Sequence, residues 1–239
     1  MRILHDQRIP REYLDAITRK FPGALFFPFM GPRPGGAQVY DSIFSHPDIY
    51  FFQIDERTLV HAPSLGEDLL SRLRDAGIRL TKGEKDPSGE YPSTALYNAA
   101  RIGGTVFHNL KAMDKGLSAA VKVLGMEISD VSQGYCACSI VPAGKRGLVT
   151  ADEGIVREAE KRGFETLLVS QGHVALPGER YGFLGGTCGA LPDESILFLG
   201  DITRHPDGEA IIAFLFGNGV NIVSLEGLPL LDVGRLIIF

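Results

Sequence analysis

The sequence lacks the features that mark nucleic-acid-binding, membrane-spanning and exported proteins. Its net charge is -5, and it has no run of lysine and arginine to form the basic patch that phosphate binding needs. Its longest apolar stretches, such as residues 210–216, are too short to span a bilayer. The first residues, 1–6, carry charge and do not form a signal peptide. We therefore expect a cytoplasmic protein with no nucleic-acid or membrane partner.

Cysteine is also scarce. The three cysteines are Cys136, Cys138 and Cys188, and an odd count without a secretory signal favours reduced thiols. One residue separates Cys136 from Cys138, whereas zinc and thioredoxin motifs have two. The sequence has no His-x-x-x-His pair and no clustered carboxylates. We expect neither a metal nor a cofactor.

Glycine and proline, by contrast, are frequent and spread along the chain, which indicates many tight turns. Five times, a helical pattern ends at a glycine and an apolar strand follows. Glycine ends a helix in the left-handed conformation without a Cβ penalty. These glycines are Gly23, Gly77, Gly125, Gly163 and Gly219. Their loose periodicity predicts an internal repeat of five units.

Helix starts agree with these ends. Pro10 is expected to open the first helix, where its missing N–H costs nothing. Ser64, Asp114 and Asp152 are predicted N-caps of the next helices because each side chain can accept from a free backbone N–H. Pro206, between His205 and Asp207, is predicted in the first turn of the fifth helix.

A predicted strand pair precedes each of the last four helices. The pairs are 49–54 with 58–62, 98–102 with 105–109, 136–142 with 147–150, and 185–191 with 195–200. The first helix lacks such a hairpin, but the chain ends in an extra apolar run, 229–239. If this run pairs beside the N-terminal unit, the ring closes and no edge strand is left bare. The alternative is an open α/β sheet.

Five such units, the first completed by the C-terminus, resemble the pentein fold, a five-bladed, pseudo-fivefold α/β-propeller. Residues 1–239 would form one such domain. The resemblance is to an uncharacterised bacterial family of this guanidino-group-modifying fold, which includes arginine deiminase, dimethylarginine dimethylaminohydrolase, glycine amidinotransferase and a non-catalytic ribosome anti-association factor. The segments that carry it are 91–92, 97–100, 133–135, 138–139, 150–154, 172–173, 176–178, 181–186, 205–207 and 231–234.

The resemblance implies a cysteine that attacks the guanidinium carbon, a histidine acid–base and carboxylates that hold the cation. The catalytic cysteine belongs in the closing C-terminal strand, yet residues 228–235 contain none. Asp232 stands there as a channel acid or as an acceptor for the turn into Gly234. His173 matches the family's histidine, without the usual acid after it, and is a general base or a loop histidine bonded to a carbonyl. Paired with Asp232, it would form an acid–base couple.

The remaining candidates are Cys138, as a nucleophile, and a predicted substrate-binding set. This set consists of Asn98, Cys188, Tyr181 and Asn109. Asn98 lies where the catalytic families place a substrate-binding acid, and it either holds a ligand or caps a turn. Cys138, at the start of an apolar strand, is a substitute nucleophile or a small buried hydrophobe. Cys188, between glycines, is a weaker candidate thiol. Tyr181 and Asn109 complete the substrate-binding set.

Two functions follow from these residues. One is a hydrolase or transferase acting on a guanidine, amidine or amide in the central channel. The other is a non-catalytic binding module built on the same ring. Convergence of His173, Asn98 and a cysteine sulfur would favour the enzyme, whereas scattered residues or a sealed Cys138 would favour binding.

Surface features leave further alternatives open. The loop 31–36 is either a lid over the channel or a plain surface excursion. Arg180, with Lys111 and Arg101, is either a positive rim for anionic substrates or solvated surface. Exposed Phe214 and Phe216 would permit a homodimer.

Overall fold

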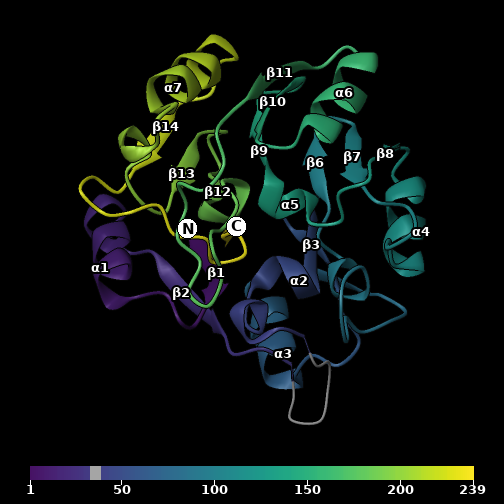
Figure 1. Ribbon diagram of the computed structural model, residues 1–239. Coiled ribbons are helices and arrows are strands. Elements are labelled where there is room, and N and C mark those ends of the chain that lie inside the picture. The colour runs from purple at the N-terminus through teal and green to yellow at the C-terminus, as the bar shows by residue number, and fades with distance from the viewer. Residues whose placement is uncertain (33–38) are drawn as a thin grey trace.

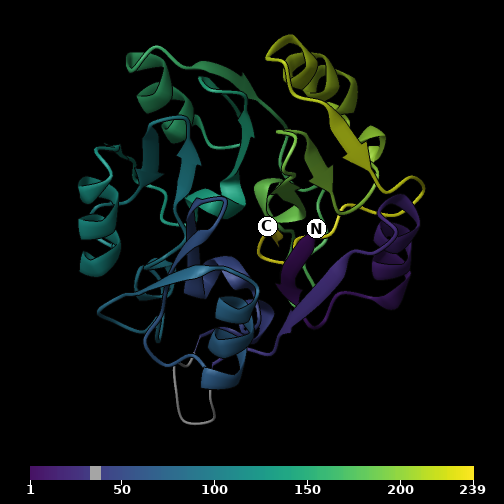
Figure 2. The ribbon, with the colours of Figure 1, turned by 180° about the vertical axis from the view of Figure 1, so that it is seen from behind.

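The computed structural model describes residues 1–32 and 39–239, which form five three-stranded sheets around a common centre (Figure 1). In each sheet the middle strand pairs antiparallel with one neighbour and parallel with the other. A helix connects the two parallel strands of each sheet, as parallel pairing requires. These five helices lie at the periphery, as the view from behind also shows (Figure 2).

The five units follow one another along the chain. The first contains β1 (Arg2–Asp6), α1 (Arg11–Lys20) and β2 (Leu25–Phe29), and is completed by β15 (Ile237–Ile238). The second contains η1 (Asp41–Ile43), α2 (Pro47–Tyr50), β3 (Phe51–Asp55), β4 (Thr58–His61), α3 (Glu67–Asp75) and β5 (Arg79–Lys82). The third contains η2 (Ser93–Ala95), β6 (Ala100–Ile102), β7 (Thr105–His108), α4 (Lys115–Val123) and β8 (Glu127–Asp130).

The last two units have the same order. The fourth contains α5 (Cys136–Ser139), β9 (Ile140–Ala143), β10 (Gly147–Thr150), α6 (Glu153–Lys161) and β11 (Glu165–Leu168). The fifth contains η3 (Gly185–Thr187), β12 (Cys188–Ala190), β13 (Ile196–Phe198), η4 (Ile202–Arg204), α7 (Gly208–Gly217) and β14 (Ile222–Ser224).

The two ends of the chain meet in one sheet, as the sequence predicts. β15 pairs antiparallel with β1, with Ile238 opposite Ile3 and Ile237 opposite Leu4. Within the described residues the five sheets remain separate, and no continuous ladder joins one to the next. Buried apolar side chains fill the space between them; for example, Phe107 of β7 meets Phe164, which precedes β11, edge to face.

The predicted helix ends are confirmed. All five glycines at the helix-to-strand junctions have positive φ, between 66° and 90°. Asp114 and Asp152 cap α4 and α6 by accepting from the backbone N–H of the third residue on. The prediction for Ser64 is wrong, because α3 begins after Gly66. Pro206 also lies outside the helix, since α7 begins after Asp207.

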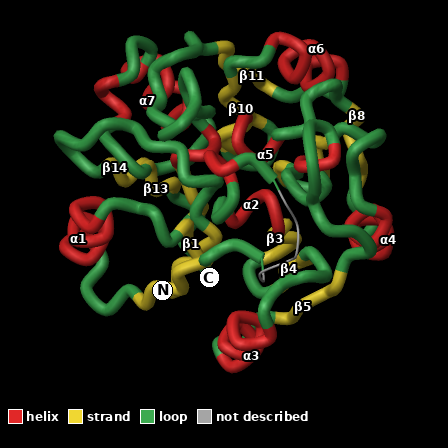
Figure 3. The backbone as a smooth tube through the Cα atoms, turned by 60° about the horizontal axis from the view of Figure 1, so that its bottom comes forward, coloured by secondary structure: helices red, strands yellow, loops and turns green. Residues whose placement is uncertain are grey.

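The predicted first strands start too early. A short helical turn precedes the first strand in four units: α2, η2, α5 and η3. Cys138, predicted to begin a strand, lies in α5, where all four residues are buried. A short apolar run that is buried on every side has no periodicity to separate strand from helix. Figure 3 shows α2 and α5 close together near the centre.

Three further predictions concern a membrane span, a homodimer and the lid loop. No helix in the described residues is long and apolar enough to cross a membrane. Phe216 is exposed whereas Phe214 packs partly against the core, so the homodimer stays a prediction. Of the predicted lid loop, residues 33–36 lie outside the described part of the chain.

Candidate functional site

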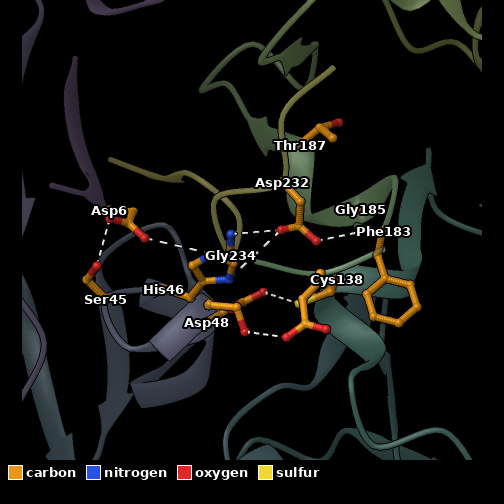
Figure 4. Close-up of polar contacts among 12 residues, drawn as sticks. Asp6, Ser45, His46, Asp48, Cys138, Phe183, Gly185, Thr187, Asp232 and Gly234 are labelled. Carbon is orange, nitrogen blue, oxygen red and sulfur yellow. Dashed lines mark hydrogen bonds and ion pairs between the residues drawn. The ribbon is translucent and has the colours of Figure 1, made fainter. Parts of the chain in front are cut away.

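Three polar residues from three successive units meet at the centre of the molecule. The thiol of Cys138 in α5 donates to Oδ2 of Asp48 in α2 at 2.8 Å (Figure 4). Asn98, which follows η2, donates through Nδ2 to the Cys138 sulfur and accepts the Cys138 backbone N–H through Oδ1, each at 3.2 Å. All three residues are buried. The ring therefore converts distant helical turns into one polar cluster.

Asp48 is the unusual member of this cluster. Burial raises its pKa to about 6, although the Cys138 thiol and the nearby charge of Arg235 oppose the shift. Within the described residues no donor meets its Oδ1 atom at hydrogen-bond geometry, although the Asn98 amide lies close enough to lower the Asp48 pKa. A buried polar atom without a partner is costly, and such atoms point to strain, a ligand or a functional role. Asp48 thus presents a carboxylate oxygen that lacks a donor.

The three thiols are held in the protonated state. Burial raises the pKa of Cys138 well above its usual value, and the charges of Asp48 and Asp232 add to the effect. Burial likewise raises the pKa of Cys188 to about 11 and that of Cys136 well above normal. Cys188 donates to Gly185 O and Cys136 to Gln133 O. A reactive thiol needs a lowered pKa, so none of the three is activated as it stands.

Asp232, in the segment between β14 and β15, supplies a second buried carboxylate. It accepts the backbone N–H of Phe183 at 2.8 Å and that of Gly234 at 3.0 Å (Figure 4). The second bond is the predicted turn into Gly234. Burial raises the pKa of Asp232, which His46 opposes. A Cβ on Gly186 would overlap this carboxylate, so glycine is required for the close approach.

His46 lies between two carboxylates (Figure 4). Its Nδ1 is 4.0 Å from Asp232 Oδ1, and its Nε2 is 3.7 Å from Asp6 Oδ2. Burial lowers the pKa of His46 in spite of both acids. Asp6 behaves oppositely: burial raises its pKa, but hydrogen bonds from Arg8 and Ser45 outweigh burial and lower it. The centre therefore holds one firmly ionised acid, Asp6, and two acids that burial protonates more easily.

The sequence argument missed Asp48, His46 and Asp6. In the sequence, His46-Pro47-Asp48 is a short motif that precedes a predicted strand and matches no known catalytic or binding motif. An available signal was its position before an apolar run, because an acid and a histidine in buried surroundings have shifted pKa values and mark functional sites. Their partners lie far away in the chain and give no local pattern.

His173 lies elsewhere, which corrects the predicted acid–base couple. Its side chain is exposed and its ring packs against His205, with centroids 5.3 Å apart. The backbones of the two segments adjoin, since Asp232 N donates to Ala175 O. Within the described residues, however, no hydrogen bond or ion pair joins His173 to Asp232. The Asp232 carboxylate faces Phe183 and Gly234 instead.

The remaining predicted residues also lie outside the cluster. Asn109 is used by its own turn: it donates to Ser132 O and accepts the Lys111 N–H. Tyr181 is half-buried and donates to Gln171 at 3.3 Å. Cys188, the first residue of β12, donates to Gly185 O in the preceding turn η3. Of the predicted set, the structure brings together Asn98 and Cys138, with Asp232 nearby.

An aromatic series leads from the surface to this cluster. Tyr91 is 42% exposed, and its ring contacts that of half-buried Tyr135 at 5.5 Å. Tyr135 in turn contacts Phe183 at 6.5 Å. Burial raises the pKa of Tyr135, and the proximity of Cys138 and Asp48 contributes to the same shift. The described residues include no group of three or more histidine, cysteine or acidic side chains placed to hold a metal.

A family of unknown function (DUF6873) has a model that matches residues 34–237. The chain belongs to this family. No curated protein matches the sequence.

Solved structures that resemble this chain include two amidinotransferases and an agmatine deiminase. The amidinotransferase SxtG of the saxitoxin pathway in Microseira wollei is 12% identical with a TM-score of 0.56, over 93% of this chain and 87% of SxtG. The inosamine-phosphate amidinotransferase of Streptomyces griseus is 15% identical with a TM-score of 0.53, over 90% and 74%. The agmatine deiminase of C. jejuni is 11% identical with a TM-score of 0.54, over 94% and 86%.

At these identities the likeness shows the fold alone. It is the pentein fold that the sequence segments predicted, and the five three-stranded sheets fit its pseudo-fivefold arrangement.

Proposed function

We propose that this chain is a binding protein that holds a small planar cation, of the guanidinium or amidinium class, at the centre of a closed pentein ring without covalent turnover. The single observation that carries the proposal is Oδ1 of Asp48, a buried carboxylate oxygen without a hydrogen-bond donor. A planar cation offers several N–H groups and one positive charge. It would supply the missing donor and remove the cost of burying the anion.

Charge balance supports a cationic ligand. Asp48 and Asp232 are both buried, and the cation that acts on Asp48 is the half-buried Arg235. Arg235 directs Nη1 towards Ala137 O at 3.4 Å and makes no ion pair with Asp48 in the described part of the chain. When both acids ionise, one arginine cannot neutralise them. An incoming cation would make up the difference and draw the pKa of both acids down.

The aromatic series supports the same class of ligand. Tyr91 contacts Tyr135, which contacts Phe183, and Tyr135 lies close enough to Asp48 for their charges to interact. Aromatic faces attract cations as well as apolar groups. The backbone of Phe183 is fixed to Asp232 by a hydrogen bond. A cation guided along these rings would arrive beside Asp232.

We also propose the domain that encloses the site, its independence of a cofactor and its cellular compartment. The ligand would be enclosed by one domain of residues 1–239 and would need no cofactor. The three free thiols support a reducing compartment such as the cytoplasm.

The experiment is ligand-dependent thermal unfolding with calorimetry. Agmatine and arginine should raise the unfolding temperature, because a ligand that binds only the folded state stabilises it. Citrulline, a neutral analogue of arginine, should not. Asp48→Asn should abolish the shift, whereas Glu56→Gln should preserve it, since Glu56 is an exposed acid in the turn between β3 and β4. Equal shifts in both variants, or none with any cation, would refute the proposal.

A second candidate is amidine hydrolysis or transfer, favoured by the short contact between Cys138 and Asp48. A bound cation would lower the pKa of the thiol, and Asp48 would accept the thiol proton. Sulfur would bond to the amidino carbon while an amine leaves with that proton, and water or a second amine would then release Cys138. The protonated, sealed thiol and the distant His173 argue against this function.

Turnover separates the two candidates. We expect the parent protein to release no ammonia, urea or amine from arginine, agmatine or methylated arginines. We expect Cys138→Ser to retain ligand binding. Release that disappears in Cys138→Ser, with a covalent adduct by mass spectrometry, would establish the enzyme instead.

A further inference from the structure

A cleft whose lining includes none of the three cluster residues Asp48, Asn98 and Cys138 lies beside the His173 loop. It has a volume of about 370 Å³, in the lower part of the range for small-molecule sites. The loop around His173, the exposed Arg180, the end of η4 and the segment before Asp232 form its walls. The lining residues are Gly172, His173, Val174, Ala175, Arg180, Arg204, Pro229 and Leu230.

The charged lining of the cleft is entirely basic. Arg180 and Arg204 are the cationic side chains, and His173 is the third polar side chain. Among the described residues, no aspartate or glutamate lines the cleft. In a chain of net charge -5, two arginines that share a hollow without an acid form a local positive field.

Most of the arginine donors are unused. Arg204 donates through Nη1 to Gly227 O at 3.0 Å, which anchors it. Arg180 makes no hydrogen bond or ion pair with any described residue. Asp201, the acid beside Arg204, is already occupied by Thr203 and Gly227. Free guanidinium groups form paired hydrogen bonds with carboxylate and phosphate oxygens.

Packing against His205 holds His173, the third basic side chain, at the cleft. His205 is buried, and its Nδ1 accepts the backbone N–H of Asp207. Burial lowers the pKa of His205, which favours the neutral ring. Its ring packs edge to face on His173, which also lies close enough to Asp207 for their charges to interact. The nearby Asp207 carboxylate is occupied by Ser170 N at 2.7 Å.

The rest of the lining is apolar: Val174, Ala175, Pro229 and Leu230. Pro229 is fixed by the hydroxyl of Tyr13, which donates to its carbonyl at 2.9 Å. Ala175 and Leu230 are joined by a backbone hydrogen bond. A firm apolar wall opposite free arginines matches a ligand with an apolar body and an anionic end.

We propose that this cleft binds a small molecule that carries a phosphate or carboxylate group on an apolar body, held by Arg180, Arg204 and His173. The site is separate from the cation site at Asp48. It gives His173 a role as a binding residue.

The test is nuclear magnetic resonance titration of the full chain with phenyl phosphate, benzoate and, as a neutral control, benzyl alcohol. At millimolar concentrations we expect saturable shifts centred on residues 172–175 and 229–230 for one or both anions, weakened by salt. Tighter binding of phenyl phosphate would indicate a ligand with a phosphate group, and tighter binding of benzoate a ligand with a carboxylate group. Benzyl alcohol should leave these signals unchanged.

Variants locate the site. Arg180→Gln should weaken binding about tenfold, because a buried or clustered charge-assisted contact is worth on the order of one power of ten in affinity. Arg180 is exposed and makes no hydrogen bond or ion pair within the described part of the chain, so this variant should fold normally. Arg57→Gln, in the exposed turn between β3 and β4, should bind as the parent does. Absence of saturable shifts here, or equal affinity in Arg180→Gln, would overturn the proposal irrespective of cation binding.

Discussion

The thiol of Cys138 lies 2.8 Å from a carboxylate oxygen of Asp48, although the two residues are 90 positions apart in the chain. Each belongs to a short helical turn that precedes the first strand of its unit. The contact is buried, and its acid has a pKa raised to about 6. Because the pKa of Asp48 is raised in the folded state, the free energy of unfolding depends on pH. The sign of this dependence follows from the direction of the pKa shift.

Asp48→Asn should remove a pH-dependent destabilisation. Burial raises the pKa of Asp48 from 3.8 to about 6, so the folded state binds the proton more tightly than the unfolded state. The stabilisation that comes from protonated Asp48 is therefore fully present below about pH 4 and is lost as the pH rises through 6. The shift corresponds to about 3 kcal/mol. Relative to Asp48→Asn, the free energy of unfolding of the parent should fall by about that amount between pH 4 and 7, measured by urea titration.

The comparison isolates Asp48 because both proteins retain Asp232, whose raised pKa acts in the same direction. Glu56→Gln is the matched control and should follow the parent at every pH. A parent and an Asp48→Asn variant whose stabilities run parallel from pH 4 to 7 would show that the Asp48 pKa is not raised.

The three thiols should resist alkylation in the folded protein. Cys136, Cys138 and Cys188 are buried, and burial raises the pKa of each. Because the thiolate is the reacting species, iodoacetamide at pH 7.5 should add no mass rapidly. Complete unfolding in guanidinium chloride should give three adducts, as the control for reagent and time. Rapid single labelling at Cys138 in the folded state would contradict the protonated, sealed thiol.

Local signals made much of the fold predictable. The five helix-ending glycines follow from a backbone conformation that few other residues adopt, and each has the expected positive φ. Asp114 and Asp152 cap their helices for an equally local reason. The helical turns before the first strands were missed because a run such as residues 136–139 is buried throughout and has no periodicity.

The site was predictable only in part. Asn98 and Cys138 were selected by resemblance, and they do meet. Asp48 and His46 could not be selected, because their significance arises when the ring brings α2 against α5 and the C-terminal segment. The placement of His173 failed for the same reason: its loop adjoins Asp232 through the backbone, while its ring turns towards His205.

Glycine substitutions should separate backbone strain from steric overlap. Gly104 has open space around a Cβ and no unusual φ, so Gly104→Ala should be close to neutral. Gly219 also has open space but a φ of 77°, so Gly219→Ala should cost about 1–2 kcal/mol. Gly234 combines a φ of 68° with overlap of a Cβ and His46. Overpacking adds about 1–3 kcal/mol to this strain, so Gly234→Ala should cost about 2–5 kcal/mol by denaturant titration.

The order of the three variants is the informative result. If Gly234→Ala costs no more than Gly219→Ala, the close approach of Gly234 to His46 is wrong. The packing that positions His46 between its acids would then also be in doubt.

The Asp6–Arg8 pair should stabilise the fold in a different pH range. Hydrogen bonds from Arg8 and Ser45 lower the pKa of buried Asp6 against the effect of burial. The stabilisation is therefore present above about pH 4 and is lost as the pH falls below that value. Asp6→Asn should reduce the free energy of unfolding by about 3 kcal/mol at pH 7, because charge-assisted buried hydrogen bonds are lost. The gap should narrow below pH 4. Asp15→Asn is the control: its ion pair with Arg11 is exposed, and such pairs contribute less than about 1 kcal/mol. Equal losses in the two variants would mean that Asp6 is not held by the buried network around His46.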